Sequence, residues 1–265
     1  MQEVRLQAIE AVFENEWAPF SYAESYDNPG LLLGRHEQII QTVMVAVDAS
    51  ESVIQQAVEA KADLLITHHP LIFHPLRRLV DSERNGRRLL QLMENGIALY
   101  SAHTNMDSAP GGNNDRACEQ LGLLHVQAVG EPGEIASLRI GQLPEPLCLS
   151  SLAALVKERF ALPTVRMVGP AEQKVHSVAL CTGSGMDFME QALKAGADVL
   201  ITGDITYHKA DDAQAAGLCL IDATHFGTDR LSVAWLCQRL GDWAQKNRFA
   251  LRVIAAQEQD LYQVV

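Results

Sequence analysis

The sequence lacks the features of several large classes of protein. None of its apolar runs is long enough to cross a membrane, and its first residues lack the basic and apolar regions of a secretion signal. The five cysteines include no C-x-x-C pair, which argues against a thiolate zinc site and for reduced, buried thiols. These absences predict a cytoplasmic protein that does not associate with membranes.

Positive charge is in the minority. The chain has 21 Lys and Arg residues against 33 Asp and Glu residues, for a formal net charge of -12. The phosphate backbone of a nucleic acid would be repelled by this field, so nucleic acid is not expected as a partner. A nucleotide can still bind locally, and two bound divalent cations would offset about four of the negative charges.

Two common catalytic motifs are also missing. The chain has no G-x-S-x-G elbow, which argues against a serine hydrolase. The stretch CTGSGM at 181–186 has neither the glycine spacing of a dinucleotide-binding loop nor the lysine of a Walker loop. Other residues must therefore supply any chemistry.

What the chain does contain is an internal repeat. Residues 47–69 align without gaps on residues 182–204, so that Asp63 falls over Asp198 and Thr67 over Thr202. Each copy follows an apolar strand and consists of an amphipathic helix and a second apolar strand, which is a βαβ unit. Residues 95–104 resemble residues 216–225 more loosely. The repeat predicts an α/β fold of two related lobes with mostly parallel sheets.

A Pro- and Gly-containing segment near residues 125–135 marks the join between the lobes. We therefore predict a first lobe at 1–128 and a second at 129–265. The tail from about residue 245 begins as a strand, and its packing against the first lobe is the alternative to this division.

Polar residues follow four of the predicted strands. Right-handed crossovers bring such strand ends to the carboxyl edge of a sheet, where α/β proteins bind their ligands. The candidate residues at these ends are His68, His69, His103, Asp107, Asp204, His208, His225 and Asp229.

The first strand end carries His68 and His69 in front of Pro70, which favours extended chain at His69. Successive residues of extended chain point to opposite sides, so we expect the two imidazoles to diverge, toward two ions rather than one. The alternative is a pair of loop histidines that are hydrogen-bonded to the backbone.

The second and third strand ends leave several roles open. His103 is a candidate ligand, acid/base group or orienting residue, and Asp107 is a candidate ligand or a turn residue. Asp204 and His208 are candidates for orienting other ligands, with a cap and a surface residue as the alternatives.

The fourth strand end carries His225 and Asp229, four residues apart. If a helix begins near His225, both side chains lie on one face and can meet one ion. Alternatively, Thr228 or Asp229 caps the helix and His225 belongs to a loop.

Together these ends offer three imidazoles and two carboxylates as metal ligands: His68, His69, Asp107, His225 and Asp229. This set exceeds the four ligands of a closed zinc site and suits two ions about 3.5–4 Å apart that share a water. Nitrogen and oxygen ligands without sulfur admit Zn, Mn, Fe, Co or Ni. Such a pair of ions activates water at neutral pH, with His103, Asp204 or His208 as candidate proton-transfer or orienting groups.

At these same strand ends the chain resembles a known family, the GTP cyclohydrolase I type 2 homologues, also called Nif-three-like or YbgI-like proteins. The matching stretches are DLLITHHPLIFHPLRRL, SAHTNMDSAPGGNNDRACEQLGL, CTGSGMDFMEQALKAGADVLITGDITYHKADDA, IDATHFGTD and the early YDNPGLLLG. The resemblance implies a ring-shaped homohexamer with two metal ions in the interlobe cleft of each subunit. It also assigns the same five ligands, although the family usually has glutamate at the position of Asp229.

Three functions stay open. A metal-dependent hydrolase acting on a nucleotide-like or other small substrate is preferred. A non-catalytic metal-handling protein and a ring-shaped scaffold or regulator are the alternatives.

Overall fold

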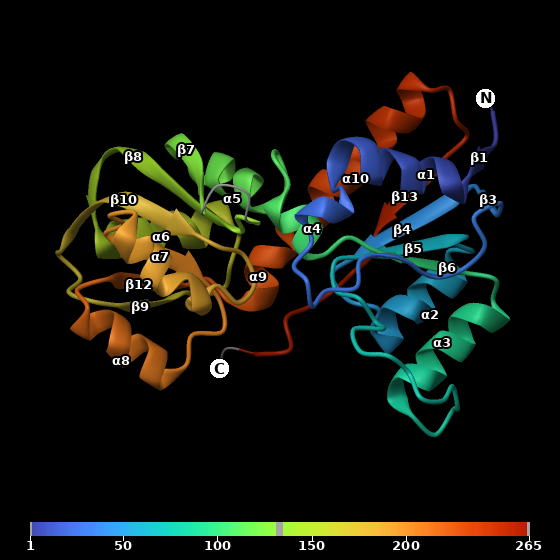
Figure 1. The fold of residues 1–265 in the computed structure, drawn as a ribbon, viewed down its shortest axis with the longest axis horizontal. Helices are drawn as coiled ribbons and strands as arrows, with labels where there is room; N and C mark the ends of the chain where they lie inside the picture. The colour runs from blue at the N-terminus through green and yellow to red at the C-terminus, as the bar shows by residue number, and fades with distance from the viewer. Residues whose placement is uncertain (1, 131–134, 264–265) are drawn as a thin grey trace. The chain divides into compact units, whose positions relative to one another are not determined.

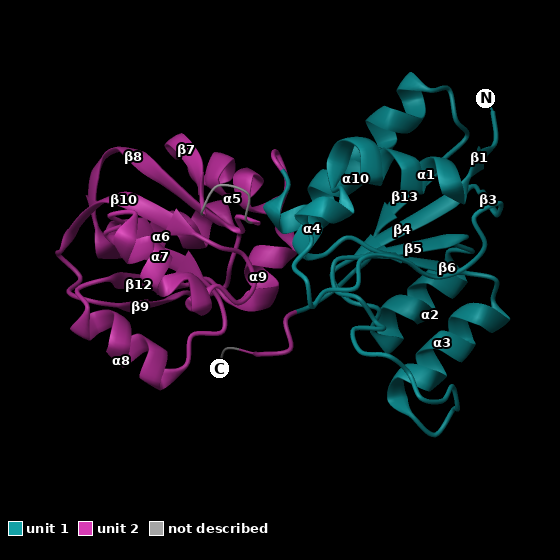
Figure 2. Ribbon diagram, viewed as in Figure 1, with its two compact units in different colours: residues 1–109, 232–259 teal, residues 110–231, 260–265 magenta. Residues whose placement is uncertain are grey.

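The computed structural model describes residues 2–130 and 135–263, which form two compact units. Unit 1 contains residues 1–109 and 232–259, and unit 2 contains residues 110–231 and 260–265 (Figure 2). This division differs from the predicted lobes, 1–128 and 129–265, because the chain passes between the units three times. The C-terminal part returns to unit 1 because strand β13 (Arg252–Ala255) pairs with strand β4 (Thr42–Ala46) of that unit.

The sheet of unit 1 has five strands in the order β13-β4-β5-β6-β2 (Figure 1). Strands β13, β4, β5 (Leu64–Thr67) and β6 (Ala98–Ser101) are parallel, and only β2 (Gly30–Leu33) is antiparallel. The residues of β4, β5 and β6 are almost all buried, which explains their continuous apolar sequence. The mostly parallel sheet predicted for this unit is confirmed.

Helices cover both faces of this sheet, as Figure 1 shows. Helices α2 (Glu51–Glu59) and α3 (Arg84–Glu94) pack on one face, and α1 (Leu6–Val12) and α10 (Leu231–Lys246) lie on the other. A π-helical turn, Phe13–Trp17, extends α1, and its Trp17 ring lies 6.3 Å from the ring of Trp243 on α10. These contacts explain why α10 belongs to unit 1.

The sheet of unit 2 has six strands in the order β7-β8-β10-β11-β12-β9. Strands β10 (Lys174–Leu180), β11 (Val199–Thr202) and β12 (Cys219–Asp222) are parallel. The flanking strands β7 (Leu124–Val129), β8 (Leu138–Cys148) and β9 (Arg166–Val168) are antiparallel to their neighbours. The repeat thus forms the parallel centre of the sheet, and the antiparallel strands lie outside it.

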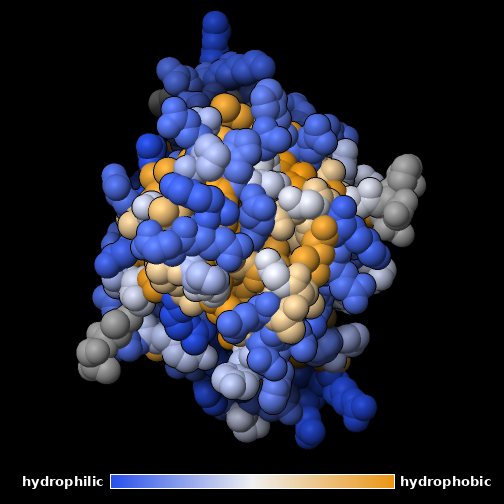
Figure 3. Space-filling view, turned by 90° about the vertical axis from the view of Figure 1, so that its left-hand side faces the viewer, coloured by the Kyte–Doolittle hydropathy of each residue, from blue (hydrophilic) through white to orange (hydrophobic). Residues whose placement is uncertain are grey.

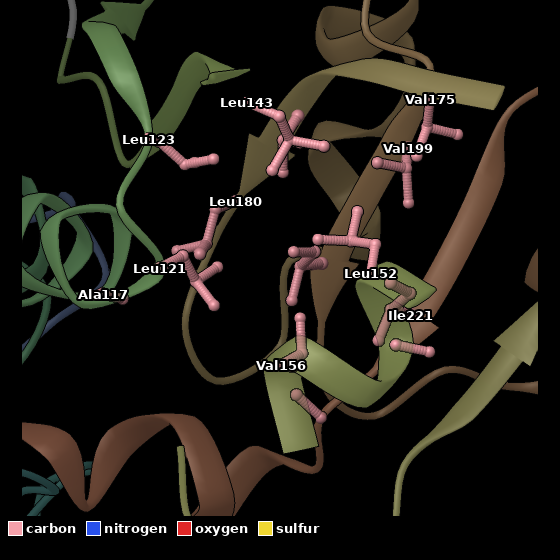
Figure 4. Close-up of a cluster of buried hydrophobic side chains, with 14 of the residues drawn as sticks. Ala117, Leu121, Leu123, Leu143, Leu152, Val156, Val175, Leu180, Val199 and Ile221 are labelled. Carbon is pink, nitrogen blue, oxygen red and sulfur yellow. The ribbon is translucent and has the colours of Figure 1, made fainter. Parts of the chain in front are cut away.

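Two hydrophobic cores lie on opposite faces of the unit 2 sheet. Helices α5 (Asn113–Leu121) and α6 (Leu149–Arg159) pack on the core that includes Leu180 and Ile221 (Figure 4). Helices α7 (Met189–Lys194) and α8 (Tyr207–Ala215) pack on the core that includes Leu200 and Leu220. Adjacent strand residues therefore belong to opposite cores, as the twofold alternation of a strand requires.

The aligned aspartates of the repeat play the same role in both units. The Asp63 carboxylate accepts backbone N–H hydrogen bonds from Gln41 at 2.8 Å and Thr42 at 2.9 Å. The Asp198 carboxylate accepts backbone N–H bonds from His176 and Ser177, both at 2.8 Å. Each aspartate thereby fixes the strand that precedes its own in the sheet, which explains why the repeat keeps it.

Among the described residues no helix is both long and apolar enough to cross a bilayer. On the face of unit 2 that Figure 3 shows, hydrophobic residues stand among hydrophilic ones.

Candidate metal centre

The two adjacent histidines of unit 1 lie directly after strand β5. Their ring centroids are 5.0 Å apart, so the prediction that they diverge is wrong. Strand β5 ends at Thr67, and the chain bends at His68 and His69 instead of staying extended. The Thr67 hydroxyl stabilises this bend by donating a 2.8 Å hydrogen bond to the carbonyl of His69. Both imidazoles can therefore belong to one group of metal ligands.

Strand β6 brings His103 and Asp107 to the same edge of the sheet. One ring nitrogen each of His68, His69 and His103 lie within 4.8 Å of one another, which is compatible with a common metal ion. Asp107 lies on the short helix α4 (Thr104–Ser108), and its Oδ2 is 3.6 Å from Nε2 of His68. Unit 1 thus brings together four of the candidate residues.

A carboxylate that sequence analysis missed, Asp27, completes this group. Its side chain is fully buried, and its Oδ1 lies 2.8 Å from Nδ1 of His103. Burial by itself would raise the pKa of Asp27, but hydrogen bonds and charge from His103, with further bonds from Thr104 and Asn28, lower it to about 2. The carboxylate is therefore ionised at neutral pH.

Only the family resemblance of YDNPGLLLG pointed to this part of the chain. Asp27 lies in a loop, 76 residues before His103, where no periodic pattern predicts a contact.

The candidate ligands of unit 2 share one short helix, α9 (His225–Asp229). Nε2 of His225 lies 3.0 Å from Oδ2 of Asp229, whose side chain is only 1% exposed. The Thr224 hydroxyl caps this helix by accepting a hydrogen bond from the backbone N–H of Gly227. The helical arrangement is therefore the one that forms, and it places both ligands on one face.

The two candidate orienting residues of unit 2 differ in position. Asp204 has its Oδ2 2.7 Å from Nδ1 of His225, so its carboxylate faces that imidazole. His208 is exposed on α8, with its ring against that of Tyr207. His208 is not part of the groups of described residues that could hold a metal ion together.

Two glycines allow the backbone of unit 2 to approach this pair closely. A Cβ atom on Gly203 would lie 2.4 Å from the backbone nitrogen of His225, a distance that real Cβ atoms do not show. Gly183 has a φ of 65°, and a Cβ there would lie 3.3–3.4 Å from the Asp229 carboxylate and Nε2 of His225. The TGSG and TGD stretches thus form the wall around the ligand pair rather than a phosphate loop.

Four histidines of the two ligand groups are oriented in the same way: His68, His69, His103 and His225. In each, Nδ1 faces an oxygen 2.7–3.1 Å away, and the four oxygens belong in turn to Ala102, Asp48, Asp27 and Asp204. An imidazole whose Nδ1–H donates to oxygen carries its lone pair on Nε2, which is how proteins orient histidine ligands of metals. The donor atoms are nitrogen and oxygen without sulfur. The ligand groups of both units therefore fit divalent metal ions.

Comparisons with known proteins agree with the family resemblance. The model of the family Duf34/NIF3 (NGG1p interacting factor 3) matches residues 4–260. A GTP cyclohydrolase 1 type 2 homolog from Clostridium acetobutylicum is 36% identical over 232 residues, with 85% of each chain covered. The homolog from Streptococcus pneumoniae is 34% identical over 257 residues, covering 95% of this chain and 94% of its own.

The fold is also similar to that of solved structures. A Bacillus cereus protein related to NIF3 superposes with a TM-score of 0.92 over 100% of both chains, at 24% identity. The family model and the curated relatives both cover most of the chain, so the chain belongs to the Duf34/NIF3 family.

Proposed function

We propose that this protein binds two divalent metal ions and uses them to hydrolyse a small, nucleotide-like substrate. The proposed ligands are His68, His69 and Asp107 of unit 1 with His225 and Asp229 of unit 2. The observation that carries the proposal is the common orientation of the three histidine ligands, each with Nδ1 facing an oxygen. Oxygen partners of this kind fix the tautomer and raise the basicity of a metal-binding imidazole.

The chemistry follows from the donor set. Bound divalent ions would lower the pKa of a water molecule and polarise an oxygen of the substrate. The residues of the chain hold the imidazoles in one orientation and bury the Asp229 carboxylate. Nitrogen and oxygen ligands admit Zn, Fe, Mn, Co or Ni. The relatives named GTP cyclohydrolase 1 type 2 homolog support a hydrolytic reaction on a nucleotide-like molecule.

A kinetic assay tests the hydrolase. Protein reconstituted with each of these metals is incubated with a panel of nucleotides, and products are measured by chromatography. We expect turnover that a chelator abolishes and that His225→Ala lowers at least about 100-fold. His36→Ala is the matched control, because His36 is an exposed histidine paired with Glu10 outside both ligand groups. Turnover that survives in His225→Ala would contradict the proposal.

Metal handling without catalysis is the second candidate. It is favoured by the exposure of two ligands, since the side chains of His69 and His225 are 24% and 33% exposed. Exposed ligands let ions exchange with solvent. Rapid metal transfer to a chelator, with no turnover on any nucleotide, would support this function over hydrolysis.

We also propose the ring-shaped homohexamer that the resemblance implies. Light scattering after size-exclusion chromatography tests it, and a monomeric mass would contradict it.

A further inference from the structure

The buried carboxylate of Asp27 forms hydrogen bonds with Asn28, His103 and Thr104. Its Oδ1 faces Nδ1 of His103 at 2.8 Å and accepts the backbone N–H of Asn28 at 2.7 Å. Its Oδ2 accepts the backbone N–H of Thr104 at 3.0 Å and the Thr104 hydroxyl. Both oxygens are thus engaged, and the side chain is fully buried.

The direction of each hydrogen bond follows from the chemistry of the partners. Backbone N–H groups only donate, and the Thr104 hydroxyl accepts from the N–H of Glu24, so its own hydrogen is directed to Asp27. An ionised carboxylate only accepts. Nδ1 of His103 must therefore carry the hydrogen that it shares with Asp27, and the lone pair of the neutral ring lies on Nε2.

The ring of His103 stands beside the proposed ligands of unit 1. Its centroid is 5.2 Å from that of His68 and 5.5 Å from that of His69, at interplanar angles of 75° and 81°. Its side chain is 18% exposed, so a small molecule can reach it from solvent. Its position and tautomer suit a hydrogen-bond and proton acceptor next to those ligands.

We propose that Asp27 is a positioning residue that holds His103 in the Nδ1–H tautomer, so that Nε2 of His103 accepts a proton from a water molecule bound beside His68 and His69. An O–H bond of the water breaks and an N–H bond forms at Nε2. The resulting imidazolium stays hydrogen-bonded to the ionised Asp27. The catalytic part of this role rests on the proposed hydrolysis, whereas the tautomer does not.

Nuclear magnetic resonance of the metal-free protein tests the tautomer. Long-range ¹H–¹⁵N spectra distinguish protonated from unprotonated ring nitrogens, and a His103→Gln variant assigns the signals. We expect the neutral His103 of the parent to carry its hydrogen on Nδ1. Asp27→Ala removes the acceptor and should lose the fixed Nδ1–H form. Asp27→Asn replaces one acceptor oxygen with an amide donor and should weaken the preference for that form.

The matched control is Asp48→Asn, the same substitution at the carboxylate that faces His69. The Asp48 side chain is 54% exposed and its Oδ1 faces Nδ1 of His69, so His103 should keep its hydrogen on Nδ1 in this variant. In the hydrolysis assay, Asp27→Asn should lower kcat by about 10²- to 10⁴-fold and change KM far less.

The outcomes separate the two parts of the proposal. A parent spectrum with the hydrogen on Nε2 overturns the positioning role, even if neither Asp27 variant folds. An altered tautomer with unchanged kcat overturns the proton-acceptor role. If the protein hydrolyses nothing, the proposed function fails, but the spectra still decide whether Asp27 sets the tautomer of His103.

Discussion

The two units use the same βαβ scaffold but place their candidate ligands differently. In the repeat, His68 of unit 1 occupies the position of Gly203 in unit 2. A side chain cannot stand at 203, because the backbone of Thr224 and His225 lies there. Unit 1 therefore presents three imidazoles from the ends of β5 and β6, whereas unit 2 presents an imidazole and a carboxylate from α9. The scaffold determines the edge of the sheet at which ligands gather, and local packing determines which positions carry them.

The carboxylates that face the histidines differ as well. Asp27 is fully buried, whereas the side chains of Asp48 and Asp204 are 54% and 52% exposed. A buried carboxylate with fixed donors holds its imidazole in one orientation. At an exposed carboxylate, water competes with the imidazole for the same oxygen atoms. We therefore expect His103 to be the most rigidly held of the three histidines that face a carboxylate.

The largest expected effect tests the glycine of unit 2. Gly203→Ala should lower the free energy of unfolding by about 3 kcal/mol or more, because the new methyl group meets backbone atoms that cannot move independently. Gly241→Ala is the control. Gly241 lies in α10 with open space around it, so alanine there should stabilise the helix by up to about 1 kcal/mol. Equal effects of the two variants in urea denaturation would show that Gly203 is not sterically required.

A smaller and equal effect is expected at the aspartates that the repeat shares. Asp63→Ala and Asp198→Ala each leave two backbone N–H groups without their carboxylate, which should cost about 2 kcal/mol in each unit. Hydrogen exchange read separately in the two units measures these losses. An unchanged free energy of unfolding in one unit would contradict the claim that the two aspartates have the same role.

The smallest expected effect is a pH dependence at Asp27. Its pKa in the folded protein is about 2, below the ordinary value of 3.8, so the ionised carboxylate stabilises the fold above about pH 4. This contribution, up to about 2 kcal/mol, should be lost as the pH falls toward 2. Urea denaturation of the parent and of Asp27→Asn should therefore show a difference in stability that shrinks between pH 5 and pH 2–3. A difference that stays constant would mean that Asp27 does not titrate as proposed.

Much of the fold and of the candidate site follows from the sequence. Buried strands and the repeat predicted the βαβ units, and polar strand ends predicted where ligands gather. The i, i+4 spacing of His225 and Asp229 allowed a shared helix face, although only the structure shows that the helix begins at His225. These features depend on residues that are close in sequence.

The remaining features depend on contacts between distant residues. Asp27 reaches His103 across 76 residues from a loop, and the pairing of β13 with β4 joins the end of the chain to its beginning. No periodicity or spacing in the sequence encodes such contacts.

Metal content tests the central claim most directly. The parent, His68→Ala, His225→Ala and the double variant are each saturated with one metal, freed of excess ion and measured by mass spectrometry of the elements, with His36→Ala as the control. We predict about two ions per chain in the parent and in His36→Ala, fewer in each single variant, and almost none in the double variant. A parent that binds no metal after reconstitution, or a double variant that still holds two ions, would contradict the account.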